Sequence, residues 1–125
     1  MPHKTTWEKE GINYQFYGDV SPEEVEEANS EAYGDHRFID IKYFIWDMTG
    51  VKNLGMNEEE DAVRSAVTDK GASLYKQSLK GALVANNKYI RKILERYIAT
   101  SLRLESTWKL KLFYNAEDAR KWITS

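Results

Sequence analysis

The sequence of residues 81–98 is GALVANNKYIRKILERYI, a short apolar run followed by a strongly patterned stretch. Residues 81–85 are small or aliphatic, which is typical of a strand buried on both faces of a sheet. The apolar side chains that follow have the i, i+3, i+4, i+7, i+8 spacing of an amphipathic helix and are Ile90, Ile93, Leu94, Tyr97 and Ile98. A strand that leads directly into a helix is the repeating unit of parallel α/β sheets. We therefore expect residues 81–98 to form one β-α unit of an α/β domain.

Strand and helix patterns alternate along the rest of the chain as well. Alternating apolar and polar side chains predict a hairpin over 7–17. A capping box at Ser21 predicts a helix that ends at Gly34, and Asn57 with the acidic residues after it predicts a second helix start. The inner face of that second helix is expected to consist of Val63, Ala66, Val67 and Leu74. The remaining predicted elements are strands at 38–46 and 108–113, a turn at 48–50 and a closing helix at 115–123.

The predicted order of elements is β-β-α-β-α-β-α-β-α. This order implies a mainly parallel central sheet of about five strands with an N-terminal hairpin and about four helices. The length of 125 residues fits one domain over residues 1–125, and the sequence has no linker, internal repeat or low-complexity segment.

Composition excludes several classes of function. The chain has no cysteine, so a disulfide scaffold, a thiolate metal site and a cysteine nucleophile are excluded. The two histidines, His3 and His36, lack the spacing of a metal site. The net charge of −2 offers no general attraction to nucleic acid. Residues 1–10 are polar, and no apolar run approaches the ~20 residues that span a bilayer, so we expect a cytoplasmic protein without an integral membrane segment.

Two stretches of the sequence are similar to those of a known fold family. Residues 43–51, YFIWDMTGV, are an apolar run that leads to an aspartate, a threonine and a glycine. Residues 112–123, LFYNAEDARKWI, are a closing strand and a helix that carries Ala119, Trp122 and Ile123. On these stretches and on its element order, the chain resembles the STAS fold, and most of all the SpoIIAA-like branch, relatives of anti-sigma-factor antagonists. The resemblance implies a non-catalytic regulatory or interaction module that works through a protein partner.

The phosphorylation site of that fold family has no match in this chain. STAS antagonists carry a phosphorylated serine or threonine at the start of a helix, and the corresponding positions here are Gly55, Met56 and Asn57, which have no hydroxyl group. Thr49 is a surrogate phosphoacceptor by residue type, and a threonine that stabilises a turn is the alternative. We therefore expect a module that lacks the usual phosphoacceptor.

The loop and helix surface over 47–61 is where the resemblance places partner binding. The residues expected to contact a partner are Asp47, Thr49, Asn57, Glu58 and Asp61. Asp47 is expected at the carboxyl end of a strand, where open α/β sheets bind ligands, and a turn residue is the alternative. A separate candidate for anion binding at a helix start consists of Asn86, Asn87 and Lys88, for which a plain helix cap is the alternative.

These observations leave two functions open. The first is an interaction module that binds a protein partner or a second copy of itself. The second is a carrier of a small molecule or lipid with an apolar aromatic pocket, whose candidate lining residues are Tyr14, Tyr17, Tyr43 and Tyr75. An enzyme that uses Asp47 or His36 has the least support, because the sequence has no GxSxG, P-loop or GxGxxG motif. We expect no cofactor and no metal ion.

Overall fold

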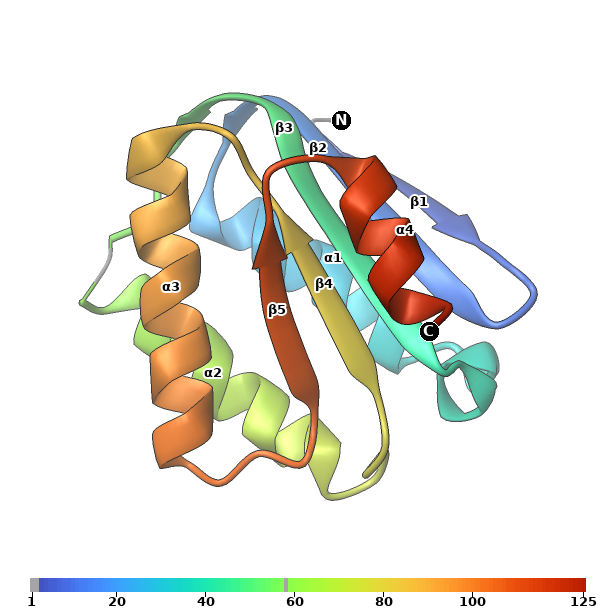
Figure 1. Cartoon of the computed structure of the whole chain (residues 1–125). Coiled ribbons are helices and arrows are strands. Elements are labelled where there is room, and N and C mark those ends of the chain that lie inside the picture. The colour runs from blue at the N-terminus through green and yellow to red at the C-terminus, as the bar shows by residue number, and fades with distance from the viewer. Residues whose placement is uncertain (1–2, 58) are drawn as a thin grey trace.

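The computed structural model describes residues 3–57 and 59–125, which form a five-stranded sheet with helices on both faces (Figure 1). The strands are β1 (His3–Trp7), β2 (Gly11–Val20), β3 (Tyr43–Leu54), β4 (Lys80–Val84) and β5 (Lys109–Phe113). The helices are α1 (Pro22–Tyr33), the short 3-10 helix η1 (His36–Asp40), α2 (Asp61–Ser73), α3 (Lys88–Arg103) and α4 (Ala116–Ile123). The predicted α/β class and element order are confirmed.

The strands lie in the sheet in the order in which they occur in the chain, β1-β2-β3-β4-β5. β1 pairs antiparallel with β2, and the pairs from β2 to β5 are parallel. Right-handed crossovers that always advance by one strand in the same direction place their helices on one face. α1 and α2 accordingly lie behind the sheet in Figure 1, whereas α4 lies in front of it. The strand order never reverses, so the sheet has no switch-point crevice at its carboxyl edge.

The pleat of the sheet divides the apolar side chains into two clusters. The larger cluster joins the sheet to α1, α2 and α3, and its members on the central strands include Tyr14, Phe44, Trp46 and Leu83. The smaller cluster faces α4 and consists of Ile45, Ala82, Val84 and Ala119. Side chains of successive strand residues point to opposite faces, which explains why Phe44 and Ile45 belong to different clusters. The larger cluster is the one that contains the candidate site.

Side-chain caps start three of the helices as the sequence predicts. Ser21 accepts a hydrogen bond from the Glu24 amide at 3.2 Å, Asn87 caps α3, and Asn115 caps α4. The second half of the predicted capping box is absent, because the Glu24 carboxylate accepts a hydrogen bond from His3 at 2.8 Å. This contact ties β1 to α1.

The third strand and the second helix differ from the prediction. β3 continues through the predicted turn at 48–50 to Leu54, because β2 pairs with it as far as Val20. α2 begins at Asp61 rather than at Asn57, whose side chain instead caps the turn before the helix by accepting hydrogen bonds from the amides of Glu59 and Glu60. Residues 38–40 of the predicted strand lie in η1.

The inner face of α2 also differs from the prediction. Val67 and Leu74, which were expected inside, are 54% and 68% exposed. The buried positions of α2 are Ala62, Ala66, Asp69 and Ser73. The helix therefore presents small side chains and one carboxylate to the larger cluster.

Gly81 on β4 allows a close approach that a larger residue would prevent. A Cβ atom at this position would lie 2.3 Å from Cζ of Phe44 and 2.6 Å from Cδ2 of Leu110. In contrast, a Cβ at Gly71 near the end of α2 would meet no atom within 4 Å. The two glycines form a matched pair for testing the packing of the sheet against its helices.

We expect Gly81→Ala and Gly71→Ala to change stability in opposite directions. Gly81→Ala must displace the buried Phe44 ring and is expected to lower the free energy of unfolding by about 1 to 3 kcal/mol. Gly71→Ala reduces the entropy of the unfolded chain and fills open space, so it is expected to raise that free energy by about 0.5 kcal/mol. Urea denaturation followed by circular dichroism measures both changes. A Gly81→Ala variant as stable as the wild type would contradict the packing described here.

Candidate functional site

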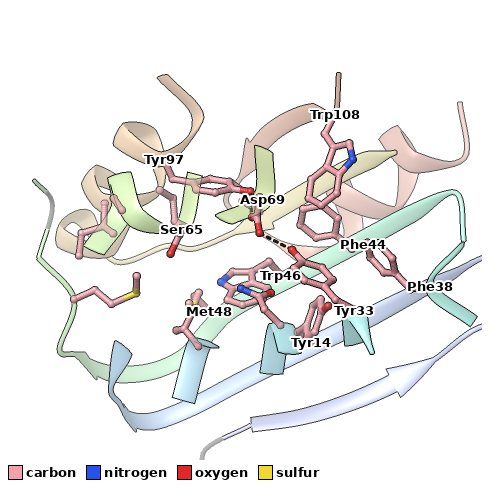
Figure 2. Close-up of a pocket in the computed structure, with 17 residues that line it drawn as sticks. Tyr14, Tyr33, Phe38, Phe44, Trp46, Met48, Ser65, Asp69, Tyr97 and Trp108 are labelled. Atoms are coloured by element: carbon pink, nitrogen blue, oxygen red, sulfur yellow. Dashed lines mark hydrogen bonds between the residues drawn. The ribbon is translucent and has the colours of Figure 1, made fainter. Parts of the chain in front are cut away.

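A pocket lies between the inner face of the sheet and helices α1, α2 and α3 (Figure 2). Its lining is mostly aromatic and aliphatic, and its members are Tyr14, Val25, Asn29, Tyr33, Phe38, Phe44, Trp46, Met48, Met56, Ala62, Ser65, Asp69, Leu83, Ile93, Leu94, Tyr97 and Trp108. The space that the centre of a water molecule can reach inside it is about 40 Å³. Because one ordered water needs about 10–15 Å³ by this measure, the pocket has room for roughly three waters or an organic group of similar size.

A single carboxylate, that of Asp69 on α2, lies within this apolar lining. The residue is only 7% exposed. Tyr33 on α1 donates a hydrogen bond to its Oδ1 atom at 2.5 Å, and Tyr97 on α3 donates one to its Oδ2 atom. Figure 2 shows Asp69 between these two tyrosines. The carboxylate therefore connects all three helices on the inner face of the sheet.

Burial controls the protonation of this group. Desolvation raises the pKa of Asp69 to about 6, although the hydrogen bonds from Tyr33 and Tyr97 oppose the rise. Burial and the nearby carboxylate also raise the pKa of both tyrosines well above the ordinary value, so their hydroxyls remain donors. Within the described residues, the lining of the pocket includes no Lys, Arg or His. The carboxylate thus has hydrogen-bond donors but no basic side chain beside it.

A groove between α1 and α2 adjoins the pocket. It offers about 170 Å³ to the centres of water molecules, four times the space inside. The groove and the pocket share the residues Asn29, Tyr33, Met56 and Ser65. The outer rim of the groove is polar and includes Glu26, Asp61, Arg64 and Thr68. The shared residues place the pocket directly beside the groove at the surface.

The residues predicted to bind a partner fall into two groups. Asp47 lies within β3, at the position that pairs with the last residue of β4, and it accepts hydrogen bonds from the amide and the hydroxyl of Thr49 at 2.9 and 2.7 Å. The second group is at the start of α2, where the Asp61 carboxylate accepts a hydrogen bond from the Asn57 amide at 2.6 Å. Glu58 lies outside the described residues. Asp61 is the member of the set that reaches the rim of the groove.

The structure gives the other predicted residues mainly structural contacts. At the start of α3, Asn87 accepts hydrogen bonds from the amides of Tyr89 and Ile90, while Asn86 and Lys88 are exposed. His36 is exposed, and the neighbouring Asp35 carboxylate accepts hydrogen bonds from the Arg37 guanidinium at 3.0 and 2.8 Å. No cluster of three or more His, Asp or Glu side chains able to hold a metal ion occurs within 3–57 and 59–125. In the same part of the chain, no helix is both long and apolar enough to cross a membrane.

Of the four tyrosines predicted to line a pocket, Tyr14 does so. Tyr17 and Tyr75 are 47% and 86% exposed, and Tyr43 lies on the α4 face, where its hydroxyl donates a hydrogen bond to Glu8.

The site residues predicted from the sequence do not include Asp69 or Tyr33, and sequence patterns place Tyr97 only on the apolar face of a helix. A signal for Asp69 was present, because the small residues Ala62, Ala66 and Ser73 share a helical stripe with it. The contacts with the tyrosines join residues that are 36 and 28 positions apart, so no local pattern indicates them.

We expect Asp69→Asn to change the pH dependence of stability. The folded-state pKa of Asp69, about 6, is above the ordinary value of 3.8, so its contribution to stability is complete below about pH 4 and is lost as the pH rises through 6. Between about pH 4 and pH 8, the wild type should lose on the order of 3 kcal/mol of unfolding free energy relative to Asp69→Asn. Urea denaturation of both proteins across this range measures the difference. Parallel stability profiles would show that Asp69 does not titrate with a raised pKa.

Comparisons with known proteins agree with this architecture. No protein-family model and no curated protein matches the chain. It is similar to the crystal structure of an uncharacterized protein of the DUF3478 family with a SpoIIAA-like fold from Shewanella loihica PV-4. The TM-score is 0.52 at 12% sequence identity, over 97% of this chain and 91% of that chain. At this identity the similarity shows the fold alone, and it confirms the expected resemblance in that respect: the chain has a SpoIIAA-like fold.

Proposed function

We propose that this STAS-like module binds a small, mostly apolar ligand in the pocket between its sheet and helices α1, α2 and α3. The observation that carries the proposal is an apolar interior pocket that adjoins the α1–α2 groove and shares Asn29, Tyr33, Met56 and Ser65 with it. Apolar pockets with a few convergent polar groups are the usual form of small-molecule sites. The groove is larger and more polar than the mostly apolar interior. This arrangement favours a ligand that places one small group inside the pocket and directs the rest of the molecule toward the groove.

The lining favours binding over catalysis. Among its described residues, the pocket has no His or Cys, and Asp69 is its single carboxylate. The oxygen atoms of that carboxylate already accept hydrogen bonds from Tyr33 and Tyr97. Burial keeps both tyrosine hydroxyls protonated, so they serve as hydrogen-bond donors to the carboxylate rather than as bases.

A pair of substitutions on α2 tests the proposal. Ser65 lines both the groove and the pocket. We therefore expect the larger ring of Ser65→Phe to fill the space where the groove and the pocket adjoin. Val67 lies outside the lining and is 54% exposed, so Val67→Phe adds the same ring on the outer face of the helix. The probes are xenon and butan-1-ol, and the readout is the indole NMR signals of Trp46 and Trp108, which line the pocket.

We expect both probes to shift the two indole signals in the wild type and in Val67→Phe, and not in Ser65→Phe. Apolar cavities of this kind take up xenon and small organic molecules. Native mass spectrometry of the freshly purified wild type is the complementary measurement, since a retained ligand adds mass to the chain. Unchanged indole signals in the wild type, together with the bare chain mass, would overturn the proposal.

A second candidate function is contact with a partner protein through residues 47–61, and one feature of β3 favours it. β4 pairs with β3 only as far as Asp47, so in the described part of the chain residues 48–54 pair with β2 alone. Thr49, Lys52 and Asn53 are exposed along this segment. A strand that is paired on one side can accept a strand from another chain. The partner strand considered for this segment is the same segment of a second copy of the chain.

Single-cysteine variants test this self-association because the chain has no cysteine of its own. Lys52→Cys places a thiol near the middle of the one-sided segment, and Glu117→Cys places one on α4, where the native side chain is 80% exposed. We expect a short thiol-reactive cross-linker to give dimers of Lys52→Cys and to leave Glu117→Cys monomeric. Equal yields from the two variants, or sedimentation of the wild type as a monomer at every concentration, would rule out pairing through β3.

A further inference from the structure

We infer that the ligand of the pocket is a small alkylammonium, with its charged nitrogen beside Asp69 and its apolar chain directed toward the α1–α2 groove. This inference rests on the proposed function, because it specifies the chemistry of a ligand for the same pocket. It is carried by one juxtaposition, a buried carboxylate surrounded by aromatic rings and without a basic side chain in the lining.

The carboxylate of Asp69 lacks the partner that buried charges usually have. Buried carboxylates in proteins are paired with a cation or neutralised, since transfer of an unpaired charge into an apolar interior is costly. Tyr33 and Tyr97 each occupy one acceptor position, on Oδ1 and Oδ2 respectively. A carboxylate has about four acceptor positions, so further N–H donors can reach it without displacing either tyrosine. With its pKa raised to about 6, the group is mainly ionised at neutral pH.

The aromatic rings of the pocket add a second attraction for a cation. The rings of Tyr14 and Trp46 lie 4.8 Å apart between their centroids, and those of Phe44 and Trp108 lie 5.8 Å apart. All four line the pocket with Asp69. The faces of aromatic rings are electron-rich, and they attract a desolvated cation that lies within about 6 Å of the ring centroid. Elsewhere the protein forms this contact with its own side chains, as where the Arg91 guanidinium stacks on Tyr114 at 3.5 Å.

The charge of the groove rim and the volume of the pocket restrict the class of ligand further. The rim of the groove carries two acids, Glu26 and Asp61, and one base, Arg64, so its formal charge favours an incoming cation. A carboxylate or phosphate ligand would meet Asp69 as a like charge. The inner space of about 40 Å³ accommodates an ammonium group and the first carbons of a chain, and the groove accommodates the rest.

Three probes of similar shape test the inference: n-butylammonium, butan-1-ol and butanoate. At about pH 7.5 an alkylamine is protonated and Asp69 is mainly ionised. We expect n-butylammonium to bind at least about tenfold more tightly than butan-1-ol, because a charge-assisted hydrogen bond is about twice as strong as a neutral one and that difference corresponds to about tenfold in affinity. Butanoate should bind most weakly. NMR titration of the Trp46 and Trp108 indole signals gives the three affinities.

Asp69→Asn and the pH dependence of the wild type provide two independent controls. In Asp69→Asn the ammonium should lose its advantage over the alcohol, while the alcohol keeps its affinity within about threefold. In the wild type the advantage should shrink between about pH 7.5 and pH 5, as Asp69 is protonated. The hydroxyls that face Asp69 belong to Tyr33 and Tyr97, with Tyr14 nearby, and the raised pKa values of all three keep them protonated over this range. The charged groups at the rim are Glu26, Asp61 and Arg64.

The outcomes separate this inference from the proposed function. If butan-1-ol binds as tightly as n-butylammonium in the wild type, the pocket is a ligand site but the inference is wrong. A preference for the ammonium that persists unchanged in Asp69→Asn, or that does not depend on pH, also overturns the inference. If neither n-butylammonium, butan-1-ol nor xenon shifts the indole signals, both the inference and the proposed function are wrong.

Discussion

The hydrogen bonds from Tyr33 and Tyr97 to the buried carboxylate of Asp69 determine how the inner helix layer is arranged. They join α1, α2 and α3 at one point above the sheet. The inner face of α2 otherwise offers mainly small side chains, Ala62, Ala66 and Ser73, which fill little volume. These hydrogen bonds join the three helices, and the small residues of α2 do not fill the space between the helices and the sheet. An apolar pocket therefore remains there. Removing the carboxylate from water opposes folding, and the tyrosine hydroxyls offset part of that penalty.

The strand order of the sheet explains why the pocket lies between the sheet and helices α1, α2 and α3. Each crossover from β2 to β5 advances by one strand, so α1, α2 and α3 share one face. A doubly wound sheet reverses its strand order and opens a crevice at the carboxyl edge. Here the order does not reverse, and Asp47 lies within a strand that continues past that edge. The pocket instead lies between the sheet and its helices and adjoins the α1–α2 groove.

The sequence predicts features that depend on neighbours in the chain and not those that depend on distant partners. The caps at Ser21, Asn87 and Asn115 are local, and the structure places helices directly after all three. The length of β3 depends on β2, which no pattern within residues 38–46 reveals. The inner face of α2 depends on hydroxyls that lie 36 and 28 residues from Asp69. An apolar periodicity that includes Val67 and Leu74 therefore indicates the wrong face.

Met56 lies where the segment after β3 meets both the pocket and the α1–α2 groove. Its side chain is 7% exposed and lines both the pocket and the groove. Its carbonyl accepts a hydrogen bond from Tyr89 at 3.1 Å, which fixes the segment after β3 to the start of α3. A ligand in the proposed site would therefore contact the segment after β3 from inside, through the buried Met56 side chain.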